Sequence, residues 1–277
     1  MSKTSEIKEI LEGSYDLHVY AGPDTQERRM DALETVKYAY ESQMGGFVLK
    51  SHEYSTAPIA NLLDNIYPGI NVIGSLSLNY AVGGINPKAV ETSAKLGAKV
   101  IWMPTLSSHH RIQKFSDSIG LKIVDNNNQL TKETIEVLEI IAEYDILLAS
   151  GNLSPIEVRK LFQEAKKRGV NKMIASNAHR IMSLDEQKSL TELGVVIEYS
   201  FQECMPNTNT LSIKELSKNL NQLDTQNCVI TSNFGQWMNP TPAEGIRMAI
   251  SFLLEEGMKA HKISQLVKEN PKNLLGI

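Results

Sequence analysis

The feature that most constrains this chain is the regular alternation of short apolar runs with amphipathic segments along its whole length. Most of the eight runs are continuously apolar rather than alternating, which is typical of parallel strands buried on both faces. The segments between them have helical spacing. Eight such units in succession favour a closed (β/α)₈ barrel, the TIM barrel of the α/β class, over an open α/β sheet. The strands are expected at residues 15–20, 46–50, 71–78, 99–104, 145–150, 172–176, 195–201 and 227–233.

Helix signals separate the apolar runs. Ser154, Pro155 and Glu157 form a helix start, with a capping hydroxyl and a proline at the first helical position, and Gly169 is expected to end that helix. The open α/β sheet is the alternative fold. Its dinucleotide-binding version is weakened because no GxGxxG motif follows the first run.

The fourth unit is irregular, because a long polar excursion follows Thr105. A short strand is expected at Leu121–Val124, and the helix of this unit is predicted over Lys132–Glu143. An insertion on this loop lies at the face where barrel active sites form, so it is either a lid or a surface excursion without a role. We predict one domain over residues 1–277, with this insertion after strand 4.

Composition excludes several classes of function. The net charge is −4, with 28 basic and 32 acidic residues, so the chain lacks the basic field of a nucleic-acid binder. The first ten residues mix charges, and no uncharged apolar run approaches the roughly 20 residues that span a bilayer. Cys204 and Cys228 are too few for a disulfide framework. We therefore expect a cytoplasmic protein that binds neither nucleic acid nor membrane. A homo-oligomer is compatible with the sequence.

Polar side chains gather at the strand C-termini, where barrel enzymes carry their sites. Period-two alternation places His18 and Tyr20 on one side of the first strand, and Lys50 and His52 on a shared side at the end of the second. Glu198 lies on the seventh strand. Five of the six histidines fall at strand ends or just after them, which favours a functional cleft over isolated structural histidines. These five are His18, His52, His109, His110 and His179.

Several motifs occur in order along nearly the whole chain. The sequence Asp-Leu-His-Val at 16–19 is followed by Ala-Gly-Pro-Asp at 21–24. Together with later motifs, these residues resemble an amidohydrolase-like family, largely uncharacterised, of the metal-dependent hydrolase superfamily. The resemblance implies a (β/α)₈ barrel with a hydrolase site. The later motifs lie at 49–52, 83–87, 101–105, 150–155, 235–236, 244–245 and 269–276.

The resemblance also implies a metal centre, and most of its ligands are replaced here. The family pattern expects His-x-His on the first strand, histidines after the fifth and sixth strands, and an aspartate after the eighth. This chain keeps His18 but has Tyr20, Asn152, Asn177 and Asn233 at the other positions. Neutral amides bind zinc-like ions poorly, and asparagine cannot replace an aspartate as general base. We therefore predict no metal ligands and no cofactor, and a hydrogen-bonding pocket for a small molecule instead.

Two functions are predicted, and the sequence does not decide whether the chain is an enzyme. The first is metal-independent catalysis, hydrolase-like or lyase-like, by His18, Lys50, His52 and Glu198. Here Lys50 acts as a base or forms a Schiff base, the alternative being an ion pair with Glu198 or Asp16. The second is a non-catalytic relative, a pseudoenzyme, that binds a metabolite or partner. The residues expected to bind the substrate are Tyr20, His109, Asn152, Asn177, His179 and Asn233.

A third alternative keeps a metal. In this alternative one divalent ion such as zinc is held by His18, His52 and either His109 or His179, displaced from the family pattern.

Overall fold

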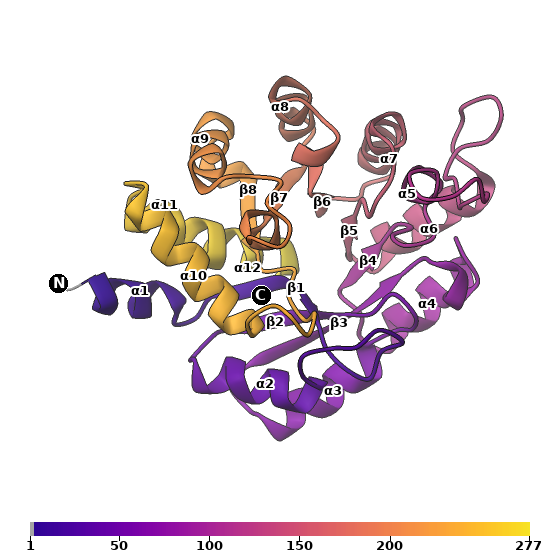
Figure 1. Cartoon of the computed structure of the whole chain (residues 1–277). Helices are drawn as coiled ribbons and strands as arrows, with labels where there is room; N and C mark the ends of the chain where they lie inside the picture. Colours follow the sequence, from indigo (N-terminus) through magenta and orange to yellow (C-terminus); the bar gives the residue numbers. More distant parts are fainter. Residues whose placement is uncertain (1–2) are drawn as a thin grey trace. The chain divides into compact units, whose positions relative to one another are not determined.

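The computed structural model describes residues 3–277, and its eight strands form one sheet in sequence order (Figure 1). The central pairs, from the third strand to the sixth, are parallel. Each strand is followed by a helix before the next strand begins, which is the order of a (β/α)₈ barrel. The strands are β1 (Tyr15–Tyr20), β2 (Gly46–Lys50), β3 (Asn71–Ser77), β4 (Val100–Trp102), β5 (Leu147–Ala149), β6 (Met173–Ser176), β7 (Val196–Ser200) and β8 (Cys228–Thr231).

The predicted barrel is confirmed, including the irregular segment after the fourth strand. The strands are buried along nearly their whole length, as continuously apolar runs require. The chain divides into two compact units. Unit 1 holds the residues up to Leu49, Ile59–Ile73 and Glu198–Ile277, and unit 2 holds Lys50–Pro58 and Gly74–Ile197. That one domain spans residues 1–277 stays a prediction.

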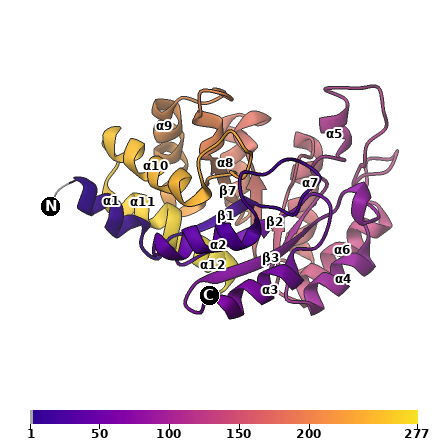
Figure 2. The ribbon, with the colours of Figure 1, turned by 60° about the horizontal axis from the view of Figure 1, so that its bottom comes forward.

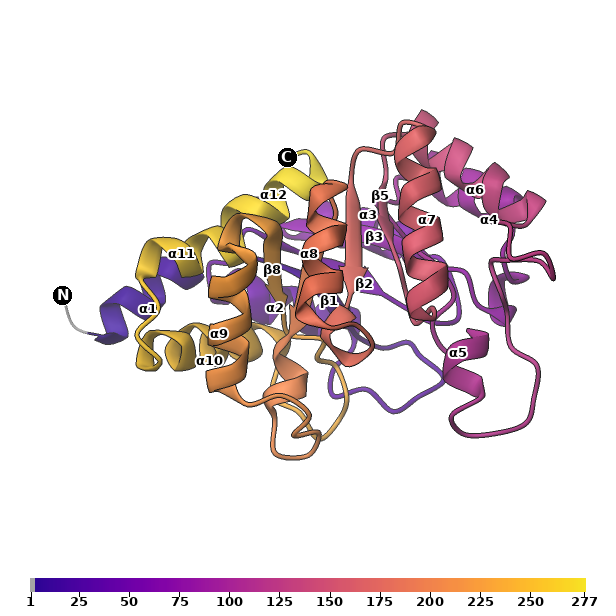
Figure 3. The same cartoon turned by 90° about the horizontal axis from the view of Figure 1, so that it is seen from above.

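Unit 1 contains β1, β8 and the helices near both ends of the chain. The helix α1 (Lys3–Leu11) packs against α10 (Pro242–Glu255) and α11 (Ala260–Ser264), as Figures 1 and 3 show. The first strand pairs with the segment after the last through a parallel bridge between Val19 and Phe234. The other elements of unit 1 are α2 (Ala32–Glu41), most of α3 (Ala57–Ile66), η3 (Phe201–Cys204), α9 (Ile213–Leu223), η4 (Thr225–Asn227), η5 (Gln265–Glu269) and α12 (Asn270–Leu275).

Unit 2 contains β4 to β6 and the helices that follow them. The helices α4 (Pro87–Lys95) and α6 (Lys132–Glu143) pack side by side, as Figure 2 shows. A capping box at Ser154 and Glu157 starts α7 (Pro155–Lys167), as predicted, and Gly169 follows the helix with a positive φ. The remaining elements are η1 (Tyr80–Val82), α5 (His109–Ile112), η2 (Ala178–Arg180) and α8 (Leu184–Glu192).

The insertion after β4 differs from its prediction in one respect. Leu121–Val124 forms no strand: Leu121 makes one parallel bridge with Ser108, and Val124 makes one antiparallel bridge with Leu130. The polar tract between Val124 and Leu130 turns the chain back, because Asp125 accepts backbone hydrogen bonds from Asn127 and Gln129. The short helix α5 lies earlier on the same loop (Figure 3).

Across residues 3–277, every helix is too short or too polar to traverse a lipid bilayer.

Candidate functional site

In unit 1, a buried chain of hydrogen bonds links Glu198, His18 and Tyr20; we call it the His18 relay. His18 Nδ1 lies 2.6 Å from Glu198 Oε1, and both side chains are almost fully buried. His18 Nε2 lies 3.1 Å from the Tyr20 hydroxyl. A carboxylate can only accept, so the Nδ1 proton of His18 points to Glu198; when the imidazole is neutral, its Nε2 then accepts from the Tyr20 hydroxyl.

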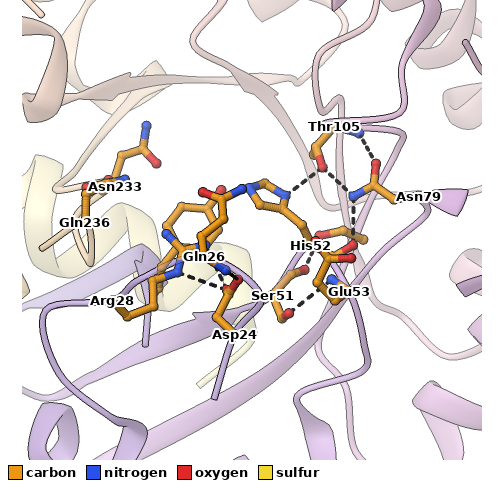
Figure 4. Close-up of polar contacts among 12 residues, drawn as sticks. Asp24, Gln26, Arg28, Ser51, His52, Glu53, Asn79, Thr105, Asn233 and Gln236 are labelled. Carbon is orange, nitrogen blue, oxygen red and sulfur yellow. Dashed lines mark hydrogen bonds and ion pairs between the residues drawn. The ribbon is translucent and has the colours of Figure 1, made fainter. Parts of the chain in front are cut away.

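Neighbouring groups hold both ends of the His18 relay. Thr231 donates a hydrogen bond of 2.8 Å to the same Glu198 oxygen, which fixes the carboxylate from β8. At the other end, the Arg28 guanidinium lies over the Tyr20 ring, 4.4 Å from its centroid. Asp24 binds Arg28 through two hydrogen bonds of 2.8 and 2.9 Å, and this ion pair is buried (Figure 4). A fixed positive charge at the ring stabilises negative charge on the phenol oxygen.

Asp16, two residues before His18 on β1, belongs to the same buried region. Its carboxyl accepts hydrogen bonds from the backbone N–H groups of His18 and Ser232, and bonds to the Ser232 hydroxyl. Burial raises the pKa of Asp16 to about 7, and the nearby Glu198 charge adds to the rise, although the hydrogen bonds from Ser232 and His18 oppose it. Asp16 therefore ties β1 to β8 and titrates near neutral pH.

A glycine allows the segment after β8 to lie against the end of β1. Gly235 has a φ of 137°, and a Cβ placed there would lie 2.1 Å from the Tyr20 carbonyl oxygen. The Tyr20 N–H also donates to the Phe234 carbonyl at 2.8 Å. Only glycine fits this close approach of two backbones.

In unit 2, His52 is held by a second polar cluster. His52 Nδ1 lies 2.9 Å from Thr105 Oγ1, which also accepts a 2.7 Å hydrogen bond from the Asn79 amide (Figure 4). Asn79 uses its remaining capacity on the backbone: it donates to the His52 carbonyl and accepts from the N–H groups of Thr105 and Ser107. Asn79 therefore fixes the segments after β2, β3 and β4 relative to one another.

Lys50 points at an aromatic ring of the same unit. Its ammonium nitrogen lies 3.5 Å from the centroid of the Trp102 ring, and both residues are buried. Trp102 is only 1% exposed and belongs to the buried core. A cation on an aromatic face is electrostatically stabilised, so the ring holds the lysine side chain in this position.

Unit 2 also contains a cavity of about 210 Å³ at the C-terminal ends of β5 and β6; we call it the β5–β6 cavity. It contains two of the predicted substrate-binding residues, Asn152 and Asn177, and it is lined further by the insertion after β4. Asn177 has a left-handed backbone with a φ of 48°, a conformation that asparagine adopts more readily than most other residues. The lining residues are His110, Arg111, Lys114, Phe115, Gly151, Asn152, Leu153, Ser176, Asn177, Arg180 and Ile181.

Backbone contacts fix the wall of the β5–β6 cavity. Gly151 has a φ of 61°, and a Cβ there would lie 2.2 Å from the Met103 carbonyl oxygen. Ser108 donates to the Asn152 carbonyl, and the Asn152 N–H donates to Pro104. The loop after β5 is therefore pressed against the segment that leaves β4.

The remaining predicted residues have separate surroundings. Asn233 has a left-handed backbone, and its carbonyl accepts from Gln236, which also accepts from Asn239. His109 begins α5, and its Nδ1 accepts a long 3.4 Å bond from Gly120. His179 lies in η2, directly after Asn177 and Ala178. Their roles in binding stay predictions.

The residues at the metal-ligand positions do not fit a zinc-type centre. Both ring nitrogens of His18 are engaged by Glu198 and Tyr20, so neither is presented to a cation. Asn152 and Asn177 offer only neutral amides, which are poor ligands for such ions. Within residues 3–277, no group of three or more His, Cys, Asp or Glu side chains is arranged to hold a metal ion.

Comparison with known sequences identifies the family. Residues 13–198 match a family of unknown function, DUF6282, and the chain belongs to this family. No curated protein matches the sequence.

Solved structures share the fold at low sequence identity. A probable dipeptidase, PvdM, from Pseudomonas aeruginosa has a TM-score of 0.70 and 11% identity, and an amidohydrolase from the same organism has a TM-score of 0.68 and 12% identity; both matches cover 99% of this chain and 98% of the other. A probable 2-pyrone-4,6-dicarboxylic acid hydrolase from Acinetobacter baumannii has a TM-score of 0.63 and 12% identity, over 96% of this chain and all of the other. The predicted amidohydrolase-type fold is confirmed.

Sequence reasoning missed several residues that shape these clusters. Arg28 and Asp24 form an i, i+4 acid–base pair in the loop after β1, a spacing that is visible in the sequence. Arg111, Lys114 and Arg180 come to one cavity from distant segments. No sequence signal brings those three together, because the path of the insertion is set by tertiary contacts.

Proposed function

We propose that this protein is a metal-independent, amidohydrolase-like enzyme that transfers protons to and from a small polar molecule at the C-terminal ends of the barrel strands. The observation that carries the proposal is the His18 relay, in which a buried carboxylate orients an imidazole whose other nitrogen faces a phenol. This is the arrangement of an oriented general base. The solved proteins with this fold are described as an amidohydrolase, a dipeptidase and a dicarboxylic acid hydrolase, which supports hydrolysis as the first reaction to test.

The His18 relay moves one proton at a time. The Tyr20 O–H proton passes to His18 Nε2, and the phenol oxygen takes a proton from the substrate or from an attacking water. The net result is one proton moved from the reacting group to His18. Glu198 stabilises the resulting imidazolium, which later returns the proton to the leaving group by the reverse path.

Arg28 has a positioning role in this proposal. Its guanidinium over the Tyr20 ring stabilises the phenolate that forms transiently, and Asp24 keeps the guanidinium in place. The role of Lys50, which lies against the Trp102 ring, as a base or a nucleophile stays a prediction. The role of His52 as a second acid or base stays a prediction.

The test combines metal analysis with turnover. The full chain is purified without chelator, its metal content is measured, and small amides, esters, lactones and β-hydroxy acids are assayed by proton NMR with and without EDTA. We expect turnover that EDTA leaves unchanged and that falls about 10²–10⁴-fold in His18→Gln. His261→Gln, which changes an exposed histidine on α11, is the matched control and leaves turnover unchanged.

Two results overturn the proposal. Turnover that EDTA abolishes and zinc restores means that the metal alternative through displaced histidines is correct. No turnover of any compound, combined with measurable binding by thermal shift, means that the chain is the non-catalytic binder.

A further inference from the structure

The β5–β6 cavity is lined by basic residues without an acidic one. Arg111, Lys114 and Arg180 line it, and none of the eleven described lining residues is Asp or Glu. His110 adds an imidazole whose pKa is lowered, first by burial and then by the neighbouring Lys114 charge. The cavity therefore has a positive lining although the whole chain carries a net charge of −4.

Buried polar atoms at this cavity have no partner within the described chain. Ser176 is only 8% exposed, and its hydroxyl makes no hydrogen bond. The same holds for His110 Nε2 and for the side-chain oxygen of Asn177. Buried polar groups are almost always hydrogen-bonded, so three in one cavity indicate that a ligand or water completes them.

Size limits the ligand. The cavity encloses about 210 Å³, which is below the roughly 300–1,000 Å³ of pockets for drug-sized molecules. Hydroxyl, amide and imidazole groups can each donate to an oxygen, and guanidinium groups pair with planar or tetrahedral oxyanions through two parallel hydrogen bonds.

We propose that the β5–β6 cavity binds a small organic anion, which Arg111, Lys114 and Arg180 recognise through a carboxylate or phosphate group and which Ser176, Asn177 and His110 orient by hydrogen bonds. The site is built from unit 2 alone. The inference goes beyond the proposed function, because it holds whether or not the bound molecule is converted.

Isothermal titration calorimetry on the full chain tests whether the cavity requires a negative charge on its ligand. Acetate, succinate, tricarballylate and inorganic phosphate are titrated at constant ionic strength, with succinamide as the uncharged counterpart of succinate. We expect at least one of the anions to bind, and succinamide to bind at least about tenfold more weakly than the best carboxylate. The carboxylate and phosphate arms show which oxyanion the cavity prefers, and binding weakens as salt is added.

Variants locate the binding. Arg180→Gln and Lys114→Gln each remove a charge, and we expect each to weaken binding of the best anion about tenfold. Lys114 is exposed, so its variant keeps the fold even if Arg180→Gln does not. The matched control is Lys188→Gln on α8, outside the cavity, which leaves the affinity unchanged.

The inference is overturned if no anion binds more tightly than succinamide, or if Lys188→Gln and Lys114→Gln weaken binding equally. His18→Gln separates this result from the proposed function, because it is expected to lose turnover and keep anion affinity. An anion that binds without turnover supports the cavity and contradicts the enzyme. If neutral compounds are turned over and no anion binds, the proposed enzyme is supported and the anion site at the cavity is contradicted.

Discussion

The His18 relay and the β5–β6 cavity show two ways of burying polar groups. In the relay, one oxygen of Glu198 is bonded by both His18 and Thr231, and His18 is also bonded by Tyr20, so these atoms are held before any ligand arrives. In the cavity, Ser176, Asn177 and His110 each have a buried polar atom without a partner in the described chain. The fold itself positions the bonded atoms of the relay, whereas the three atoms of the cavity are the ones that the proposed anion would bond.

The largest predicted effect is a change of folding stability with pH. It is caused by Asp16, which lies beside the His18 relay and not at the β5–β6 cavity. Its pKa in the folded protein is about 7, above its ordinary value, so the folded state binds this proton more tightly than the unfolded state. The contribution of Asp16 to stability is complete below about pH 4 and is lost as pH rises through 7, by about 4 kcal/mol at most. Chemical denaturation between pH 4 and 8 measures this loss.

The matched variants for this experiment are Asp16→Asn, which removes the titration, and Asp185→Asn, which changes an exposed carboxylate on α8. We expect the stability of Asp16→Asn to vary less with pH over this range, and Asp185→Asn to follow the natural chain. A pH profile that Asp16→Asn leaves unaltered contradicts the assignment.

Gly235 lies beside the His18 relay and Gly151 lines the β5–β6 cavity, and the backbone of each lies against a carbonyl oxygen of another segment. Replacing them tests whether both regions depend equally on this close packing. Gly235→Ala and Gly151→Ala each place a Cβ within 2.1 or 2.2 Å of a carbonyl oxygen. We expect each to lower the free energy of unfolding by about 3 kcal/mol or more. Gly169→Ala is the control, since its φ is also positive but its Cβ meets no atom within 4 Å, and it costs about 1–2 kcal/mol. Equal losses in all three variants, measured by urea unfolding, would falsify the packing argument.

Removing one hydroxyl from the His18 relay and one from the β5–β6 cavity compares a hydrogen-bonded group with one that has no partner in the described chain. Thr231→Val keeps the shape of the side chain but takes a donor from Glu198, so we expect a loss of about 1–3 kcal/mol in stability. Ser176→Ala removes a hydroxyl that bonds to nothing in the described chain, so its stability changes by less than about 0.5 kcal/mol. Thermal unfolding of both variants measures these losses, and a larger loss for Ser176→Ala contradicts the absence of a partner for its hydroxyl within the described chain.

Removing a helix cap is expected to give the smallest loss of stability, and the loss should be the same in unit 1 and unit 2. Ser212 caps α9 in unit 1 and Ser154 caps α7 in unit 2, each in a capping box with a glutamate three residues later. Replacing either serine with alanine is expected to cost about 1 kcal/mol. Urea unfolding of both variants measures it. A difference of several kcal/mol between them shows that the units differ in general stability, which would weaken the other comparisons.

Sequence patterns predicted the fold better than the site. The buried runs at Tyr15–Tyr20 and Gly46–Lys50 have the predicted bounds, because apolar continuity there coincides with hydrogen-bonded pairing. The run at 99–104 is longer than the strand Val100–Trp102, because Pro104 has no N–H to donate and the chain turns toward the insertion. The apolar run therefore predicted which residues after Trp102 are buried, but it did not predict where the strand ends.

Part of the geometry of the candidate site could be predicted, whereas the roles of its residues stay predictions. Alternation along β1 correctly placed His18 beside Tyr20, since period two is a local property. The partnership of His18 with Glu198 joins strands far apart in the sequence, and the basic lining of the β5–β6 cavity depends on where an irregular loop runs. Neither has a local signal, so a single sequence cannot supply them.

The separation between His18 and Glu198, 180 residues, has a consequence for how the protein is made. At a translation rate of about 5–20 residues per second, roughly 10–35 s pass between synthesis of the histidine and synthesis of the glutamate that orients it. During that interval the nascent polypeptide carries an imidazole without its carboxylate. The proton relay that we propose can therefore form only after the ribosome has made Glu198.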